Sequence, residues 1–506
     1  MSGLPDWLDP LYEAEEMRAA DAWAIEEQGV PSLDLMERAG AGLARVTAAA
    51  ARPGRVRVVV GKGNNGGDGL VVARLLREDG HDVDVLAVAP LEELRGDPAA
   101  NLDRLPGAPP EPFAPELLAR SGVVVDALLG TGFEGSPREP VTSAIAAINA
   151  QDAPTVACDV PSGVNASSGE VDGEAVRAAA TATFHGSEVG LHVEPGKEHA
   201  GDVHVVEIGI PRGAPGASGA GLISERVLDL FPRRRRSGSK FSSGVVVVVG
   251  GSTGLTGAPT MAARAAQRAG AGYVQVAVPA PAQPAVDLRL LEQMSRGLPD
   301  EHGSHTPAGV EHVQEMAERA GAVVLGPGIG RAPGALEFAR GVARAVQTPL
   351  LVDADGLNAH AGRLELLRDR RAATVLTPHE GELARLLELD SEAVHRQRLA
   401  CAREAAERSG ALVLLKGDDT IVAAPGGPAA ISPGGTPALA TAGTGDVLSG
   451  LIGALLAKDL GPLEAAAMGA LAHVLAGRAA AESFGVDHVI AGDVIDALPA
   501  GLTRRA

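Results

Sequence analysis

Oxygen-bearing side chains follow several short apolar runs in the first half of the chain. Asn65 lies in the glycine-rich stretch Gly61–Gly69, directly after Val56–Val60, and Asp126 and Asp159 stand at the ends of two later runs. Ligands of parallel sheets bind outside the carboxyl ends of the strands, so we expect these positions to converge. Glycines let backbone N–H groups approach an anion at a helix N-terminus. Carboxylate, amide and hydroxyl oxygens suit a hard cation.

The second half carries its sharpest signal near the C-terminus. Gly443-Thr-Gly-Asp446 opens an expected helix, whose free N–H groups form an anion hole for a transferring phosphoryl group. Asp446 beside that hole is a candidate base for a substrate hydroxyl. Other expected strand ends carry Asp353–Asn358, Thr377–Glu382 with His379, and Lys416–Thr420.

The stretch Gly61–Gly69 also contains the spacing G-x-G-x-x-G of dinucleotide-binding folds. Those folds place an acidic residue about 20 residues further on, at the end of the next strand. Here that strand ends Leu86-Ala-Val-Ala-Pro90, without an acid. A redox dinucleotide domain is therefore disfavoured.

The elements that must position these residues alternate between short apolar runs and helical patterns. Typical predicted elements are the strand Val83–Val88 and the helices Leu70–Glu78 and Ser391–Ser409. Such alternation predicts an α/β fold with doubly wound parallel sheets, Rossmann-like in the N-terminal half. The turn-forming stretch Pro211–Gly221 predicts a linker. We expect domains at 1–215 and 225–506, with the linker at 216–224.

Composition limits the possible functions. The 506 residues are 45% hydrophobic with a net charge of −20, which argues against a nucleic-acid or membrane-surface binder. Two cysteines build neither a disulfide framework nor a zinc site, and they fit a reducing cytoplasm. No apolar run is long enough to span a membrane, and the N-terminus does not look like a signal peptide. The 65 glycines predict backbone-built binding loops.

The first half resembles the NAD(P)H-hydrate epimerase domain. The resemblance rests on Met17–Asp21, Gly29–Gly40, Gly63–Gly69, Asp126–Gly132 and Asp159–Gly163, in that order. It implies epimerisation of hydrated NADH and NADPH at C6, with Asp159 as acid/base. The implied K⁺ ligands are Asn65, Asp126 and Ser162. The implied hydrate-binding residues, besides Asp159, are Asn64, Asn65, Gly66, Gly67, Asp68, Gly130, Thr131, Gly132, Phe133, Glu134, Gly135 and Ser136.

The second half resembles NAD(P)H-hydrate dehydratase, which implies a ribokinase-like α/β domain. The motifs shared with that family include Gly326–Gly330, Asp353–Asn358, Thr377–Glu382 and Gly443–Asp446. The implied hydrate-binding residues are Ala258, Gly328, His379 and Asp446. The implied nucleotide-binding residues are Lys416, Gly417, Asp418, Asp419, Thr420 and Gly445. One departure is Ser239-Lys-Phe241, where the family often has His-Lys-Gly.

These resemblances imply one bifunctional repair enzyme. Its substrates would be NADHX and NADPHX, the hydrated nucleotides, and ADP would donate the phosphoryl group with Mg²⁺ bound. Asp446 would act as the base of the dehydratase. We also expect a homo-oligomer. The alternative is a ribokinase-like vitamin or sugar kinase with an N-terminal binding domain.

Overall fold

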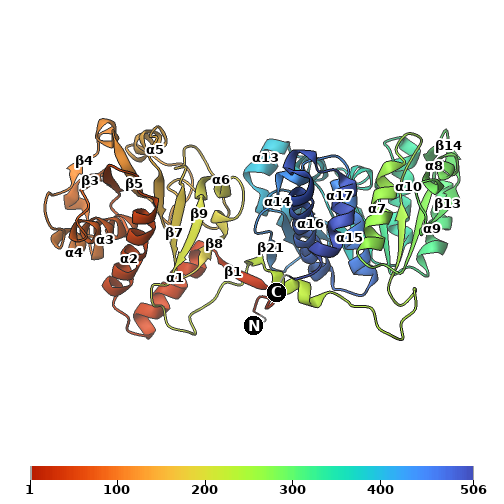
Figure 1. The fold of residues 1–506 in the computed structure, drawn as a ribbon, viewed down its shortest axis with the longest axis horizontal. Coiled ribbons are helices and arrows are strands. Elements are labelled where there is room, and N and C mark those ends of the chain that lie inside the picture. The colour runs from red at the N-terminus through yellow and green to blue at the C-terminus, as the bar shows by residue number, and fades with distance from the viewer. Residues whose placement is uncertain (1–2, 505–506) are drawn as a thin grey trace. The chain divides into compact units, whose positions relative to one another are not determined.

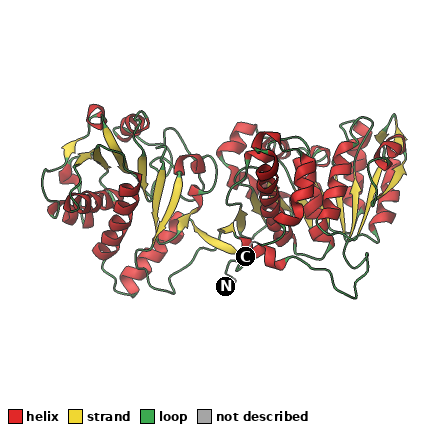
Figure 2. Ribbon diagram, viewed as in Figure 1, coloured by secondary structure: helices red, strands yellow, loops and turns green. Residues whose placement is uncertain are grey.

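The computed structural model describes residues 3–504. The described residues form two compact units, of which the first comprises Gly3–Leu4 with Pro10–Gly221 and the second comprises Pro5–Asp9 with Leu222–Arg504. Residues 211–219 form no helix or strand, and β10 (Ala220–Ile223) follows them. Figures 1 and 2 show the helices and strands of both units.

Unit 1 contains a sheet in which every neighbouring pair of strands is parallel, in the order β4-β3-β2-β5-β6-β7-β9. The strand order reverses between β2 and β5, and the loops that follow these two strands open a crevice there. The strands are β2 (Arg55–Val60), β3 (Val83–Ala87), β4 (Glu111–Pro112), β5 (Ser121–Ala127), β6 (Thr155–Cys158), β7 (Ala180–Phe184) and β9 (Asp202–Val206). The helices are α1 (Ala14–Ala22), α2 (Ser32–Ala50), α3 (Asn64–Glu78), α4 (Asp97–Asp103), α5 (Val141–Asn149) and α6 (Gly196–Ala200).

Both faces of this sheet are covered by helices. Val58 packs in one apolar cluster with Leu43 of α2 and Leu70 of α3. Its neighbour Val59 points the other way, into a cluster with Ile145 of α5. Because successive side chains of a strand alternate between faces, a strand buried on both sides needs a continuous apolar run.

Unit 2 contains a mixed sheet in the order β13-β12-β11-β16-β17-β18-β19-β20-β21. The strands from β13 to β19 pair in parallel, whereas β20 and β21 are antiparallel. The strands are β11 (Val245–Val249), β12 (Tyr273–Pro279), β13 (Met294–Leu298), β16 (Ala322–Leu325), β17 (Leu350–Val352), β18 (Thr374–Leu376), β19 (Leu412–Leu415), β20 (Ile421–Ala423) and β21 (Ala429–Ile431), with a separate hairpin β14 (Asp300–Glu301) and β15 (Ser304–His305).

Two long helices lie near the C-terminus of unit 2. The first is almost wholly buried, and the second is buried over most of Ala465–Gly477 but exposed at its C-terminal end. These are α15 (Thr444–Ala457) and α16 (Pro462–Phe484), which group with α7 and α17 in Figure 1. A Cβ on Gly450 would lie 2.0 Å from the carbonyl oxygen of Ala262, so part of the glycine excess serves close helix packing. The remaining helices are α7 (Gly257–Arg268), α8 (Gln283–Asp287), α9 (Val310–Ala317), α10 (Pro333–Ala345), α11 (Asp355–Asn358), α12 (Glu380–Leu387), α13 (Ser391–Arg396), α14 (Arg398–Ser409) and α17 (Ala491–Gly501).

The predicted α/β class with parallel sheets is confirmed, but two element boundaries were wrong. The helix expected to begin at Leu70 begins at Asn64, so two thirds of the glycine-rich stretch Gly61–Gly69 is helical rather than a loop. The helix expected over Ser391–Ser409 is divided at Gln397, whose φ of −132° and ψ of 46° lie outside the helical region.

Candidate active sites

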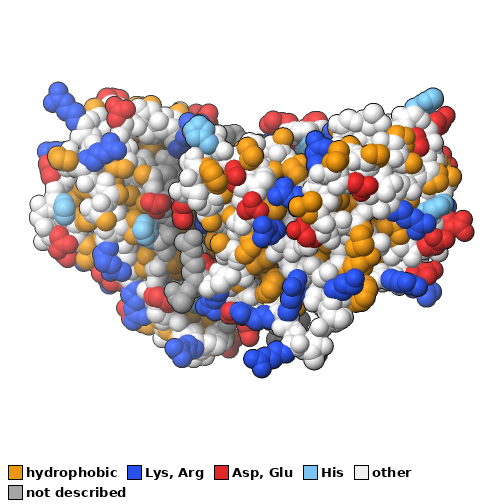
Figure 3. Space-filling model, turned by 45° about the vertical axis from the view of Figure 1, so that its right-hand side comes forward, with side chains coloured by type: hydrophobic (Ala, Val, Ile, Leu, Met, Phe, Trp, Pro, Cys, Tyr) orange, Lys and Arg blue, Asp and Glu red, His pale blue; other side chains and the backbone are white. Residues whose placement is uncertain are grey.

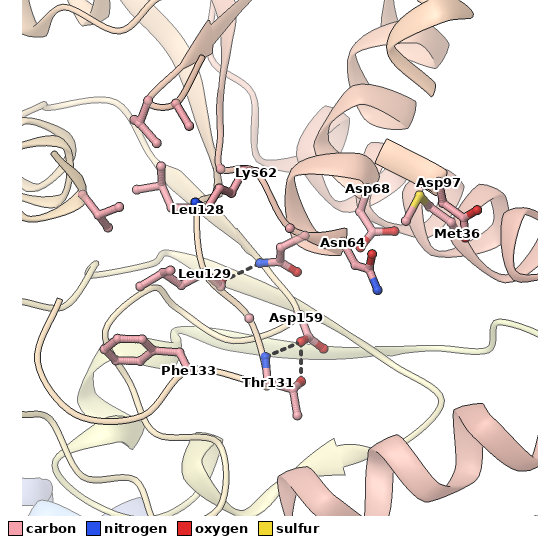
Figure 4. A pocket seen from close by; sticks show the side chains of 18 of the residues that line it. Met36, Lys62, Asn64, Asp68, Asp97, Leu128, Leu129, Thr131, Phe133 and Asp159 are labelled. Carbon is pink, nitrogen blue, oxygen red and sulfur yellow. Dashed lines mark hydrogen bonds between the residues drawn. The ribbon is translucent and has the colours of Figure 1, made fainter. Parts of the chain in front are cut away.

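A cavity of about 1250 Å³ lies at the strand-order reversal of unit 1 (Figure 4). A cavity of this volume can hold a bulky organic ligand. Most of the predicted hydrate-binding residues line it. These are Asn64, Asn65, Asp68, Asp159 and the whole loop of Gly130, Thr131, Gly132, Phe133, Glu134, Gly135 and Ser136.

Gly66 and Gly67 are buried in the first turn of α3 and do not line the cavity. A Cβ on Gly66 would lie 2.1 Å from the carbonyl oxygen of Gly61, and one on Gly67 would lie 2.8 Å from the Met36 side chain. Glycine at both positions therefore allows close packing. Because neither residue carries a Cβ, the N-terminus of α3 can lie close to the end of β2.

Asp159 follows β6 and is held in a strained backbone conformation. Its φ is +69°, a value that non-glycine residues rarely adopt. Its carboxylate accepts hydrogen bonds from the backbone N–H of Thr131, at 2.9 Å, and from the Thr131 hydroxyl. Figure 4 shows these contacts with Asn64 and Asp68 across the cavity. Backbone strain of this kind clusters at active sites.

Further carboxyl groups gather around Asp159 that sequence reasoning did not assign. Burial, and then the nearby Asp159 charge, raises the pKa of Asp21 to about 6. The same causes, in the same order, raise the pKa of Glu188 well above its usual range. Asp21 belongs to the motif Met17–Asp21, but no sequence signal marks Glu188, which is close to Asp159 only in the folded state.

The predicted cation ligands Asn65, Asp126 and Ser162 lie together; Asn65 lines the cavity, and Asp126 and Ser162 lie behind it. The buried Asp126 carboxylate accepts hydrogen bonds from the backbone N–H of Ser162, at 2.8 Å, and from its hydroxyl, at 2.6 Å. The Asn65 amide lies 2.5 Å from the carbonyl oxygen of Leu129 and 2.9 Å from that of Cys158. Burial raises the pKa of Asp126 to about 6. A buried carboxylate beside a hydroxyl and carbonyl oxygens fits a hard cation, and a rotation of the Asn65 amide, whose nitrogen now faces the carbonyls of Leu129 and Cys158, would add an amide oxygen.

In unit 2, Asp446 on the first turn of α15 belongs to a charged cluster. Lys416 Nζ lies 2.9 Å from Asp353 Oδ1 and 3.8 Å from Glu382 Oε2. Burial lowers the pKa of Lys416, but Asp353, Glu382 and Asp446 outweigh it and raise the value. Burial raises the pKa of Asp446 to about 7; Asp353 and Glu382 add to the shift, and Lys416 opposes it. Such a value is typical of a general base that works near neutral pH.

Glycines near this cluster leave room for a ligand to lie close to the backbone. Gly443 has φ +94°, and a Cβ on Gly445 would lie 3.6 Å from Lys416 Nζ. The predicted hydrate residues Gly328 and Ala258 adjoin one another, since a Cβ on Gly328 would lie 3.3 Å from that of Ala258. His379 caps α12, and its exposed ring lies 3.6 Å from Glu382.

The residues of the predicted nucleotide-binding loop after β19 differ in their exposure to solvent. Gly417 and Asp418 are exposed, and Asp418 Oδ1 accepts the N–H of Gly435 at 2.8 Å. The Thr420 hydroxyl donates within the loop to the Gly417 carbonyl at 2.7 Å. Asp419 is fully buried and pairs with Arg398 at 2.8 Å. Arg398 is therefore a residue of this region that sequence reasoning missed.

Within 3–504, no group of three or more His, Cys, Asp or Glu side chains is arranged to hold a metal ion. In the same residues no helix is long and apolar enough to cross a membrane. Acidic and basic side chains both occur across the face drawn in Figure 3.

The chain has two α/β units. Each unit places carboxylates beside glycine-containing loops at the carboxyl ends of parallel strands. This arrangement is that of an enzyme of the nucleotide-binding α/β class. Residues 246–500 match a family model described as NAD(P)H-hydrate dehydratase, and residues 32–190 match one described as YjeF-related protein N-terminus. The chain is 43% identical to the bifunctional NAD(P)H-hydrate repair enzyme Nnr of Salinibacter ruber, over 97% of this chain and 95% of that protein. Its identity to the enzyme of the same name from Moorella thermoacetica is 39%, over 97% and 96%.

The chain thus belongs to the family of bifunctional NAD(P)H-hydrate repair enzymes, with epimerase and dehydratase activities on one polypeptide. Among solved structures it is similar to the ADP/ATP-dependent NAD(P)H-hydrate dehydratase of Bacillus subtilis co-crystallised with ATP/Mg²⁺. That similarity covers 55% of this chain and 95% of the other, at 25% identity and a TM-score of 0.48.

Proposed function

We propose that unit 1 interconverts the R and S epimers of NADHX and NADPHX and that unit 2 dehydrates the S form to NAD(P)H. ADP is the phosphoryl donor and leaves as AMP and phosphate. The observation that carries this division is that each unit has its own carboxylate beside backbone that contains glycine. In unit 1 this is Asp159, which follows β6, and in unit 2 it is Asp446 in the first turn of α15. We assign 1–215 to the epimerase, 216–224 to the linker and 225–506 to the dehydratase.

In the epimerase, Asp159 exchanges a proton with the C6 hydroxyl of the hydrate. The support for this role is its position on the cavity wall and its two hydrogen bonds from Thr131, which fix the carboxylate. A carboxylate beside a carbinolamine carbon can act as general acid and base. The residues Asn64–Asp68 and Gly130–Ser136 hold the hydrate around it.

K⁺ is the cation that we propose for Asn65, Asp126 and Ser162. Its positive charge would compensate the buried Asp126 carboxylate, which is hydrogen-bonded only to Ser162 and Leu128 among the described contacts. With K⁺ bound, the Asn65 amide would present its oxygen, together with the carbonyls of Leu129 and Cys158. The loops that follow β2, β5 and β6 would then be held in one arrangement.

In the dehydratase, Asp446 removes the proton of the C6 hydroxyl as that oxygen bonds to the β-phosphorus of ADP and AMP leaves. The phosphate ester at C6 then departs as inorganic phosphate, a far better leaving group than hydroxide. Loss of the C5 proton restores the nicotinamide double bond. Backbone N–H groups at Gly443–Gly445 and the ammonium of Lys416 face the transferred charge. Bound Mg²⁺ would neutralise nucleotide oxygens.

The decisive assay gives the purified protein mixed epimers of NADPH hydrate together with ADP. Full recovery of dihydronicotinamide absorbance supports both activities, whereas recovery of one epimer's share leaves unit 1 without its function. The kinase alternative predicts a phosphorylated product that persists and no recovery of absorbance. Family membership favours the repair reaction over that alternative.

Two proposals concern the protein in the cell. We propose a cytoplasmic location, supported by two buried cysteines that form no disulfide. We also propose a homo-oligomer, which light scattering of the purified protein would test.

A further inference from the structure

Glu188 is a buried carboxyl group of unit 1 that is close to Asp159 but does not line the cavity. It lies in β8 (Ser187–Glu188), where it pairs in parallel with Tyr12, and none of its surface is exposed. Thr131 and Thr183 contact its two carboxyl oxygens, Thr131 at 3.4 Å from Oε1 and Thr183 by a close hydrogen bond to Oε2. Thr131 is also the residue that donates to Asp159.

The number of hydrogens in this cluster is too small for two carboxylates. The Thr183 hydroxyl also lies 3.1 Å from the carbonyl oxygen of Gly186, and the Thr131 hydroxyl donates to Asp159. Each hydroxyl has one proton, so the two hydroxyls supply hydrogens for at most two of these four oxygen–oxygen contacts. A proton on Glu188 supplies a further donor, because a carboxylic acid donates through O–H whereas a carboxylate only accepts.

Charge leads to the same placement of the proton. The Asp159 charge acts on Glu188 across the cluster, and it also acts on Asp21 and Asp68 at the cavity side. Of two neighbouring carboxyl groups, the one farther from water takes the proton, since burial penalises its charged form. Glu188 is wholly buried, whereas Asp159 reaches the cavity.

We propose that Glu188 is a positioning residue of the epimerase, a neutral carboxylic acid that hydrogen-bonds the Thr131 and Thr183 hydroxyls and thereby holds Thr131 as the donor to Asp159. Glu188 itself does not reach the cavity. Its effect on the reaction is therefore to keep the Asp159 carboxylate aimed at the C6 hydroxyl, and this role rests on the proposed function of Asp159.

The test compares Glu188→Gln with Glu188→Met in the full-length protein. Glutamine keeps a neutral donor, so we expect epimerisation within about threefold of wild type, whereas methionine removes the donor and lowers kcat by about 10²-fold with little change in KM. The wild-type rate should fall as rising pH ionises Glu188, and this fall should be absent in Glu188→Gln. Equal losses in both variants, no loss in Glu188→Met, or the same fall with rising pH in Glu188→Gln would overturn the proposal.

A second pair of variants does not depend on Glu188 itself. Thr181 and Thr183 are both fully buried on one face of β7, but Thr181 donates to the carbonyl of Ala200 and not to a carboxyl group. We expect Thr183→Val to lower epimerisation and Thr181→Val to leave it near the wild-type rate; equal rates in the two variants contradict the proposal.

The dehydratase rate of each preparation, measured with S-hydrate and ADP, reports the amount of active protein. Asp159→Asn is measured in parallel. If that variant keeps its activity, the role of Asp159 is wrong; if it is inactive while the Glu188 and Thr183 variants are normal, only the present inference fails.

Discussion

Asp446 combines a position at a helix N-terminus with an environment rich in negative charge. Burial and the neighbouring carboxylates hold its pKa at about 7, so a large fraction of the side chain is protonated at neutral pH. Only the deprotonated form accepts a proton, and its fraction falls about tenfold for each pH unit below the pKa.

The dehydratase rate should therefore fall about tenfold per pH unit below about pH 7. The kcat of dehydration, measured with saturating ADP and S-hydrate, checks this, and Asp446→Ala should abolish the reaction while epimerisation continues. A dehydration rate that is constant between neutral and mildly acidic pH, or that survives in Asp446→Ala, contradicts the assignment of the base.

Asp159 makes the complementary prediction for unit 1. Asp159→Ala removes the carboxylate on the cavity wall, so the conversion of R-hydrate should stop while S-hydrate is still dehydrated with ADP. The measurement is the recovery of NADPH absorbance from each separated epimer. Unchanged turnover of R-hydrate would reduce unit 1 to a binding domain.

At the scale of elements, the first turn of α3 packs closely against the end of β2 because it contains glycine. A Cβ on Gly66 would lie 2.1 Å from backbone, while one on the neighbouring Gly63 would meet nothing within 4 Å. Gly66→Ala should lower the free energy of unfolding of unit 1 by about 1–3 kcal/mol and impair epimerisation, because overpacking forces backbone shifts. Gly63→Ala is the matched control, and equal thermal stability of the two variants would contradict the packing role.

The loop after β19 is braced by a buried ion pair. Arg398 on α14 donates to Asp419 at 3.0 Å, to the Lys416 carbonyl at 3.2 Å and to Glu380 on α12 at 2.5 Å. It thereby connects the proposed nucleotide loop to the helix that His379 caps.

Arg398→Met leaves Asp419 buried without its cation, which costs about 3–5 kcal/mol. We expect a lower melting temperature together with a raised KM for ADP. The exposed neighbour Arg396, which lies 3.8 Å from Glu392, provides the control, since surface pairs contribute only about 0–1 kcal/mol. A wild-type KM for ADP in Arg398→Met would show that the pair does not position the loop.

For the whole molecule, the two activities should differ in their need for a divalent cation. Chelation of Mg²⁺ with EDTA should stop dehydration, which transfers a charged phosphoryl group, and leave epimerisation intact. Interconversion of the separated epimers, followed by chromatography, provides the second readout. If EDTA stops epimerisation and spares dehydration, the two reactions are assigned to the wrong units.

An acidic protein that binds polyanionic nucleotides needs a source of attraction other than a basic surface. With a net charge of −20, the chain places backbone N–H groups at strand-end loops, and Lys416 at one of them. Both units use the same edge of a parallel sheet for this purpose. Fusion joins two reactions on the same substrate, because a dehydratase acting on one epimer alone would leave the other unrepaired.

The sequence by itself determined the α/β class, the strands around both sites and the family, because apolar runs and strand-end motifs are local patterns. The tertiary structure decided which side chains meet. Thr131 contacts Asp159 across 28 residues and Glu188 across 57, and Arg398 reaches a loop through side chains that have no local signal. It also decided that Gly66 serves packing and that Asp419 faces inward. Parallel strands bring together residues far apart in the chain, so these contacts depend on long-range packing that no short pattern records.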